Sequence, residues 1–199
     1  MTPEMQRVVA EAKAAARGGW NDEVVASLAE STRDLRCNAD ELARLLALPE
    51  ADHGFREEVF MTDPSFHASV FALAEGDTIP LHDHPRMDVI SKVLRGRVRV
   101  RAYEWVDAAT LLARECGEVI IGEGDGALVL RNSPGTLHTI TALAGTAFLD
   151  LFAPYYDDAA RPCNYYAVAR PAARRRRASR RDASAPVSLR IVTWEEARR

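Results

Sequence analysis

The sequence predicts an all-β core, an antiparallel barrel of two sheets, with N-terminal α-helices packed outside it. Residues 4–47 have helical periodicity, whereas the chain from residue 58 onward breaks into short apolar or alternating segments. Turns rich in Gly, Asp, Asn and Pro separate those segments at short intervals, as a double-sheet barrel requires. We therefore expect a helical segment at 1–50 and a barrel at 55–199 that includes an arginine-rich loop at about 170–185.

The composition is that of a single folded unit. With 199 residues and 47% hydrophobic content the chain can bury a sizeable core. The charged start is unlike a signal peptide, and no apolar run approaches the ~18 residues of a membrane span. We expect a soluble cytoplasmic protein, with the nucleus as a further location. Three scattered cysteines do not form a disulfide framework and are expected to be reduced.

Charge is distributed unevenly along the chain. Residues 170–181 carry seven arginines, and removing these from the net charge of -3 leaves -10 for the remainder. An acidic body argues against nucleic-acid binding, and the arginine run has no aromatic side chains to stack on bases. We expect this run to be a solvated loop, with a localisation signal or a contact to an anionic partner as the alternatives. We also expect no membrane partner and a monomeric state.

The helical region divides into three helices. The first stops before Gly18, the second covers about 21–35, and the third begins at Asn38 and ends before Pro49. Asn38 caps the third helix, with Glu41 three residues later in a capping-box arrangement.

The clearest strand signals flank the dipeptide at 95–96. Residues 89–94 are largely apolar, and residues 97–105 alternate strictly, with Val98 and Val100 on one face and arginines on the other. This pattern predicts a β-hairpin that turns at Arg95-Gly96. Further strands are predicted at 58–62, 67–73, 118–121, 126–131, 145–152 and 187–194, and after His138.

The segment 76–85 contains the pair His82-x-His84. Side chains alternate along a strand, so both imidazoles point to one side while Asp83 points to the other. Two strand histidines can be ordinary polar residues, but here a glycine turn precedes the pair, and the lone His138 follows a turn some fifty residues later. This layout is typical of a cupin, a small β-barrel that holds a metal in its mouth.

Two ligand sets remain open at this point. If Asp88 binds the metal, the site is a mixed histidine and carboxylate site. If it does not, three neutral imidazoles leave the full 2+ charge of the metal for the substrate, which favours a thiolate. The charge argument favours the all-histidine set.

Four segments, at 79–106, 132–138, 148–156 and 161–166, resemble the plant cysteine oxidase and cysteamine (2-aminoethanethiol) dioxygenase family. The resemblance implies a cupin fold and an Fe(II)-dependent dioxygenase that uses O2 to convert a thiol to a sulfinic acid, with His82, His84 and His138 as the iron ligands. It also implies a substrate: the N-terminal cysteine of a protein or peptide, whose oxidation marks a protein for degradation according to oxygen supply. Cysteamine is the alternative within this class.

The resemblance also implies further catalytic residues. Asp150 matches an aspartate implicated in catalysis, and it either handles the substrate ammonium or orients a histidine. Tyr156 closes the family's Pro-Pro-Tyr motif and either donates a hydrogen bond to oxygen or packs. Cys163 and Tyr165 match a Cys-x-Tyr pair that is covalently joined in an animal member.

The chain departs from the family pattern at three positions. Arg86 replaces a common glycine, Asp88 is an acid where the family rarely has one, and Tyr155 replaces the second proline of the Pro-Pro-Tyr motif. We predict substrate-binding roles for Arg86 and Asp88, with a solvent-facing Arg86 as the alternative. A non-catalytic metal cupin that binds a peptide, and an isomerase-type cupin with Asp88 as a fourth ligand, are the competing functions.

Overall fold

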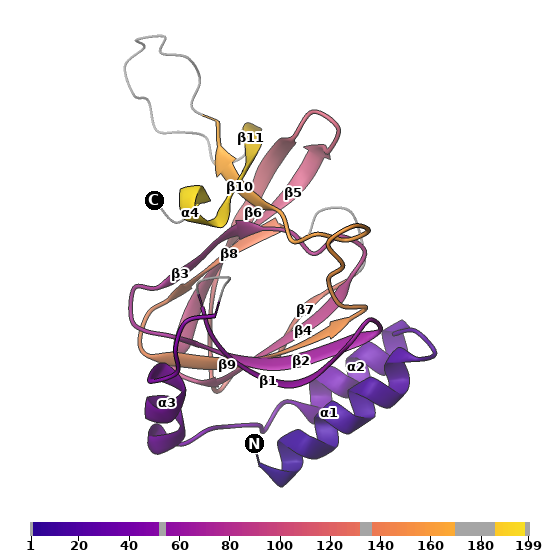
Figure 1. Cartoon of the computed structure of the whole chain (residues 1–199), viewed down its shortest axis with the longest axis vertical. Helices are drawn as coiled ribbons and strands as arrows, with labels where there is room; N and C mark the ends of the chain where they lie inside the picture. Colours follow the sequence, from indigo (N-terminus) through magenta and orange to yellow (C-terminus); the bar gives the residue numbers. More distant parts are fainter. Residues whose placement is uncertain (1, 52–54, 132–136, 170–185, 198–199) are drawn as a thin grey trace.

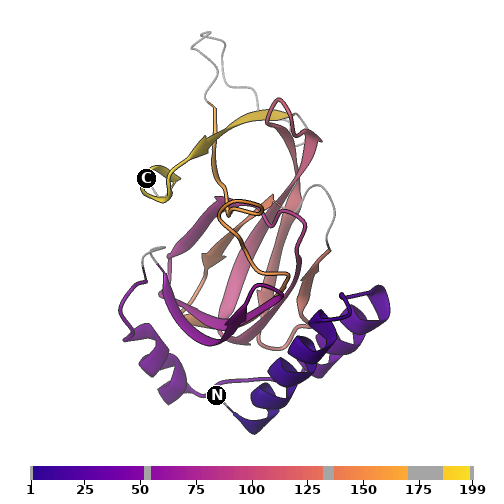
Figure 2. The ribbon, with the colours of Figure 1, turned by 45° about the vertical axis from the view of Figure 1, so that its right-hand side comes forward.

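The computed structural model of the chain describes residues 2–51, 55–131, 137–169 and 186–197. Two β-sheets face each other as a barrel, and the N-terminal helices lie outside it (Figures 1 and 2). The predicted cupin fold, an all-β core with helices packed outside, is confirmed. The helices are α1 (Pro3–Ala16), α2 (Asp22–Ser31), α3 (Ala39–Leu46) and α4 (Trp194–Ala197).

One sheet has the strand order β1-β2-β9-β4-β7, and the other has the order β10-β11-β6-β5-β8-β3 and closes because β10 also pairs with β3. Seven of these ten pairings join strands that are not consecutive in sequence, as in the jelly-roll arrangement of a cupin. The strands are β1 (Arg56–Asp63), β2 (Phe66–Leu73), β3 (Thr78–His82), β4 (Asp88–Arg95), β5 (Arg97–Asp107), β6 (Leu112–Gly122), β7 (Leu128–Leu130), β8 (Leu137–Ala142), β9 (Thr146–Ala153), β10 (Tyr165–Val168) and β11 (Val187–Val192).

The first three helices begin at side-chain caps. The Thr2 hydroxyl and the Asn21 and Asn38 side chains each accept a hydrogen bond from a backbone N–H of the first turn, which satisfies a donor that has no partner within the helix. The predicted cap at Asn38 is therefore confirmed. The second helix ends at Ser31, earlier than predicted, and turns follow it.

Strands β2 and β9 are buried on both faces. Every residue of β9 is buried, which explains its continuous apolar run. On one face, Val70 and Leu149 pack in a cluster with Val8 and Leu28 of the helices, and on the other face Phe148 packs with residues of the opposite sheet. The helices thus cover the outside of this sheet, and its inner face is left for the barrel interior.

The predicted hairpin at 95–96 is wrong. Strand β4 pairs with β9 and β7, whereas β5 pairs with β6 and β8, so the chain crosses from one sheet to the other at Gly96. Gly96 has a φ of 82°, and a Cβ there would collide with the carbonyl oxygen of Gly145. A tight glycine corner and a hairpin turn have the same local sequence, and the pairing partners decide between them.

The alternation of buried and exposed side chains along β5 holds only for its first half. Val98 and Val100 are buried as predicted, but Tyr103, which alternation places on the opposite face, is buried as well, in a cluster with Leu137 and Tyr166. The register shift with β6 at this point inserts an extra residue, Cys116, into β6, while β5 itself stays in register with β8.

The predicted C-terminal strand does return to the barrel, because β11 pairs with both β10 and β6. The arginine run at 170–181 lies outside the described residues. Within the described part of the chain, no helix is long and apolar enough to cross a membrane.

Candidate metal centre

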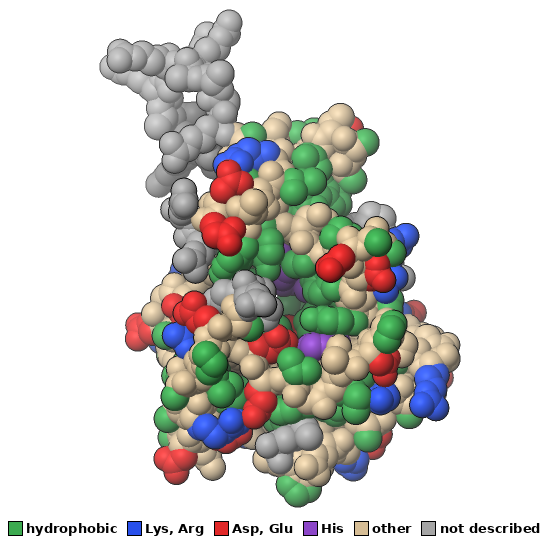
Figure 3. Space-filling model, viewed as in Figure 1, with side chains coloured by type: hydrophobic (Ala, Val, Ile, Leu, Met, Phe, Trp, Pro, Cys, Tyr) green, Lys and Arg blue, Asp and Glu red, His purple; other side chains and the backbone are tan. Residues whose placement is uncertain are grey.

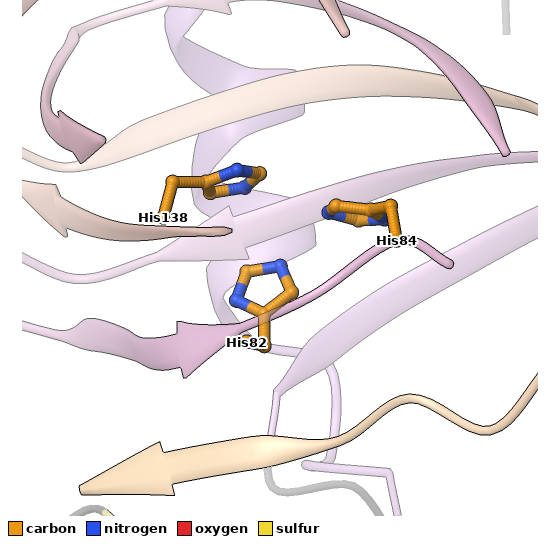
Figure 4. A group of neighbouring side chains, drawn as sticks. All are labelled: His82, His84 and His138. Carbon is orange, nitrogen blue, oxygen red and sulfur yellow. The ribbon is translucent and has the colours of Figure 1, made fainter. Parts of the chain in front are cut away.

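Three histidines meet inside the barrel. His82 ends β3, His84 follows two residues later, and His138 lies in β8 directly opposite His82 in the strand pairing. One nitrogen from each ring lies within 4.8 Å of the others, and all three residues are buried. Figure 4 shows the imidazoles converging on a common space from the two strands. The structure thus brings the three predicted ligands together.

Hydrogen bonds orient two of these rings. His82 Nδ1 lies 2.8 Å from the Pro80 carbonyl oxygen and must therefore carry the proton. The Tyr156 hydroxyl lies 2.9 Å from the Asp83 carbonyl oxygen and 2.6 Å from His84 Nδ1. Because a hydroxyl has one proton, Tyr156 donates to the carbonyl and accepts from His84 Nδ1–H. Both rings then present Nε2 as the nitrogen for a metal, as outer hydrogen bonds do in known metal sites.

The electrostatics fit a cationic metal. Burial lowers the pKa of His82 and lowers the pKa of His84 and His138 well below the ordinary value, so the imidazoles are neutral and can donate lone pairs. His138 Nδ1 is buried without a hydrogen-bond partner among the described residues. Three neutral imidazoles suit a transition metal such as iron, zinc, copper or nickel.

Asp83 points away from the two histidines that flank it, as strand alternation predicts. Its carboxylate accepts hydrogen bonds from the Asn164 backbone N–H at 3.0 Å and from the Tyr166 hydroxyl at 2.7 Å. These bonds fix the segment that carries Cys163 and Tyr165 against the histidine strand.

A cavity of about 290 Å³ opens beside the histidines. Its wall is largely aromatic, and its only charged side chains among the described residues are carboxylates; no Lys or Arg in the described ranges lines it. In Figure 3 hydrophobic and acidic side chains border a hollow in which histidine is visible. The lining residues are Phe55, Glu57, Phe71, Ile79, His82, His84, Ile140, Asp150, Phe152, Tyr155, Tyr156, Asp158, Pro162, Cys163 and Tyr165.

The other predicted catalytic residues all line this cavity. Asp150 lies on β9, and its Oδ1 is buried with no hydrogen-bond partner among the described residues. Cys163 lies between Tyr156 and Tyr165 and interacts with both hydroxyls. Burial raises the pKa of the Cys163 thiol to about 11, so the protonated thiol is the stable form there.

Arg86 and Asp88, predicted to bind substrate, are not brought into the cavity. Arg86 is exposed and its guanidinium donates to the Ala160 carbonyl. Asp88 is buried at the start of β4, where its carboxylate lies 3.3 Å from Arg131 Nη1. Neither belongs to the three-histidine group or to the cavity wall.

The position of Asp88 leads to a testable prediction. Asp88→Asn should retain metal at the wild-type stoichiometry, because the carboxylate pairs with Arg131 rather than with the histidines. Weakening that ion pair should lower the free energy of unfolding by about 1 kcal/mol. Elemental analysis and urea unfolding measure the two effects, and loss of metal would refute the three-histidine ligand set.

The Asp150 carboxyl gives a pH prediction. Burial raises its pKa from 3.8 to about 7, a Ser91 hydrogen bond opposes the shift, and Glu57 adds to it. The folded chain therefore holds a proton that the unfolded chain releases between about pH 4 and 7, so the free energy of unfolding falls as the pH rises through this window.

Asp150→Asn removes this penalty. In metal-free protein, the free energy of unfolding of the variant relative to the wild type should rise by roughly 2–4 kcal/mol from pH 4 to pH 8. Each pKa unit corresponds to about 1.4 kcal/mol. Urea titrations at the two pH values test this, and parallel pH profiles for both proteins would contradict it. A bound cation would also shift the pKa of the Asp150 carboxyl, so the protein is first treated with a chelator.

Sequence reasoning missed one group on the cavity wall. Glu57, on β1, accepts a hydrogen bond from His67 Nε2 at 3.1 Å, and the His67 ring stacks on Tyr155. Tyr155 is far from the other two residues in sequence, and no motif links the three. The replacement of proline by Tyr155 was the one signal that pointed to this group.

A cupin barrel with three buried, converging imidazoles defines a metal-binding cupin. The PCO_ADO family matches residues 55–197, well over half of the sequence. The chain belongs to this family.

Named relatives agree with the assignment. The chain is 36% identical to human 2-aminoethanethiol dioxygenase over 140 residues, covering 57% of this chain and 52% of the human protein. It is 34% identical to plant cysteine oxidase 2 of Arabidopsis thaliana over 117 residues, covering 51% of this chain and 40% of the plant protein. The chain thus spans about half the length of these relatives or less.

Solved structures with a similar fold include KdgF from Halomonas sp., with a TM-score of 0.42 and 26% identity, covering 56% of this chain and 88% of that protein. A cupin superfamily protein from Desulfitobacterium hafniense has a TM-score of 0.41 and 12% identity, covering 54% and 84% respectively.

Proposed function

We propose that this chain is an Fe(II)-dependent thiol dioxygenase that converts the N-terminal cysteine of a protein or peptide to the sulfinic acid. The observation that carries the proposal is the group of three buried, neutral imidazoles beside an aromatic cavity, in a chain of the PCO_ADO family. Both atoms of O2 are added to the thiol sulfur, which loses four electrons as O2 gains four. His82, His84 and His138 would hold the iron, and bound iron would supply the activation of O2 beside the thiol.

The residues of the chain have separate tasks in this proposal. Tyr156 keeps the His84 ring oriented through its hydroxyl. Asp150 faces the cavity with a carboxyl whose pKa of about 7 suits the transfer of a proton near neutral pH. The aromatic wall excludes water from the reacting thiol.

The charge of the cavity supports a substrate with a cationic end. Glu57, Asp150 and Asp158 line it without a Lys or Arg among the described residues, so an ammonium is attracted and a carboxylate is repelled. An N-terminal cysteine and cysteamine both carry an ammonium without an adjacent carboxylate, whereas free cysteine has one. The cavity is larger than cysteamine fills, which favours the peptide as substrate over the small thiol.

Oxygen uptake by the full chain tests the proposal. Protein loaded anaerobically with Fe(II) should consume O2 with a Cys-initiated peptide and with cysteamine, but not with the matched Ser-initiated peptide. The same protein loaded with zinc should consume none. No uptake with any thiol would point to the non-catalytic metal cupin, and a higher kcat/KM for cysteamine than for the peptide would favour the small-thiol alternative.

A location in the cytoplasm or nucleus, and a role in coupling oxygen supply to protein degradation, are further parts of this proposal. The role in degradation requires that the oxidised N-terminus belongs to a protein within the cell.

A further inference from the structure

One wall of the cavity carries a layered arrangement of Glu57, His67 and Tyr155, which we call the Glu57 wall. His67 is buried on β2, and its Nε2 donates to Glu57 Oε1 at 3.1 Å. The His67 imidazole also stacks on the Tyr155 ring, with the two ring centroids 3.9 Å apart and the ring planes 8° apart. The Glu57 side chain is only 8% exposed, although it lines the cavity.

Such a carboxylate is held in place rather than mobile. The stacked Tyr155 ring restricts the orientation of the imidazole, and the imidazole N–H in turn directs the carboxylate. The backbone of Tyr155 is itself anchored, because the Arg161 guanidinium donates to its carbonyl oxygen at 3.0 Å. The arrangement therefore fixes a negative group at one position of the wall.

Glu57 also lies within electrostatic reach of Asp150, since it contributes to the raised pKa of that carboxyl. Two carboxyls facing one aromatic cavity repel each other, and this repulsion is relieved when a cation enters between them. A carboxylate accepts several hydrogen bonds, so the bond from His67 is compatible with a further one from an ammonium.

We infer that Glu57 is a specificity-determining residue that binds the ammonium of an aminothiol substrate, with His67 and Tyr155 as the positioning residues that aim it. This inference rests on the proposed function and names which residues recognise the cationic end. It also gives a role to Tyr155, one of the positions at which the chain departs from its family's motif: the ring supplies the flat face on which His67 stacks, which a proline cannot do.

Two thiols that differ only at the cationic end test the inference by binding. Cysteamine carries an ammonium, and 2-mercaptoethanol has a neutral hydroxyl in its place. Anaerobic calorimetry with the iron-loaded full chain should show that Glu57→Gln weakens cysteamine binding about 10-fold, the usual effect of one hydrogen bond to a charged group. Binding of 2-mercaptoethanol should not change.

Glu58, the residue next to Glu57 in the sequence, offers a matched control. Glu58 pairs with Arg44 at 2.6 Å and does not line the cavity, so Glu58→Gln should leave the affinity for both thiols unchanged. His67→Phe, which keeps an aromatic ring but removes the N–H, should reproduce part of the effect of Glu57→Gln. Tyr155→Leu, which removes the stacking ring, should also weaken cysteamine binding, and Tyr155→Phe, which keeps the ring, should restore it.

The outcomes separate this inference from the proposed function. Equal weakening of both thiols by Glu57→Gln, or no effect on cysteamine, overturns the inference even if the wild type consumes O2. A selective loss of cysteamine binding supports it even if no thiol supports O2 uptake. If Glu57→Gln does not fold, His67→Phe is judged by the same criterion, a selective loss of cysteamine binding. A wild type that binds cysteamine no better than 2-mercaptoethanol overturns the inference outright.

Discussion

His138→Ala should abolish metal retention and, with it, thiol oxidation. The three imidazoles converge within 4.8 Å, and His138 is the one contributed by a separate strand, so its loss leaves only the His82 and His84 pair. The affinity for the metal should fall by more than about 100-fold, since loss of even an outer hydrogen-bond partner of a ligand can cost that much. Elemental analysis after gel filtration measures the bound metal directly.

His67→Ala is the matched control for this prediction. His67 is also a buried barrel histidine, but it bonds to Glu57 and lies outside the three-histidine group. It should therefore keep a full equivalent of metal. Equal metal content in His138→Ala and the wild type would show that the three histidines are not the ligand set.

Asp150→Asn should keep the metal and lose turnover. The side chain faces the cavity but is absent from the three-histidine group, and the amide has almost the same shape as the carboxylic acid without its ability to accept a proton. A positioned general acid or base contributes about 10²–10⁴-fold, so kcat should fall by that order. Oxygen uptake and elemental analysis on the same preparation separate the two effects.

Asp88→Asn serves as the control, because it makes the same chemical change at another buried aspartate away from the cavity. It should retain both metal and turnover. If Asp150→Asn loses metal together with activity, the carboxyl supports the ligands rather than the reaction. Unchanged turnover would remove Asp150 from the mechanism.

Periodic patterns in the sequence were sufficient to predict the fold class and to predict that His82 and His84 lie on the same side of their strand. Alternation depends on local backbone geometry alone, and it also predicted that Asp83 faces the other way. The same reasoning failed at Gly96, because a hairpin turn and a corner between sheets differ only in which strands they pair with.

The cavity wall combines two consecutive strands with a segment that lies far from them in sequence. Glu57 and His67 meet across β1 and β2, and Tyr155 arrives from the segment after β9. Arg86 was predicted to bind substrate because it is close in sequence to His84, but it lies in a turn with a φ of 57° and is exposed. Closeness in sequence to a ligand therefore did not predict a position in the cavity.

The most direct test of the central claim is mass spectrometry of a Cys-initiated peptide after reaction with the iron-loaded chain under ¹⁸O2. A thiol dioxygenase should give a sulfinic acid in which both added oxygen atoms are ¹⁸O, and the matched Ser-initiated peptide should be unchanged. A disulfide as the only product, an unmodified cysteine, or oxygen derived from water would contradict the assignment.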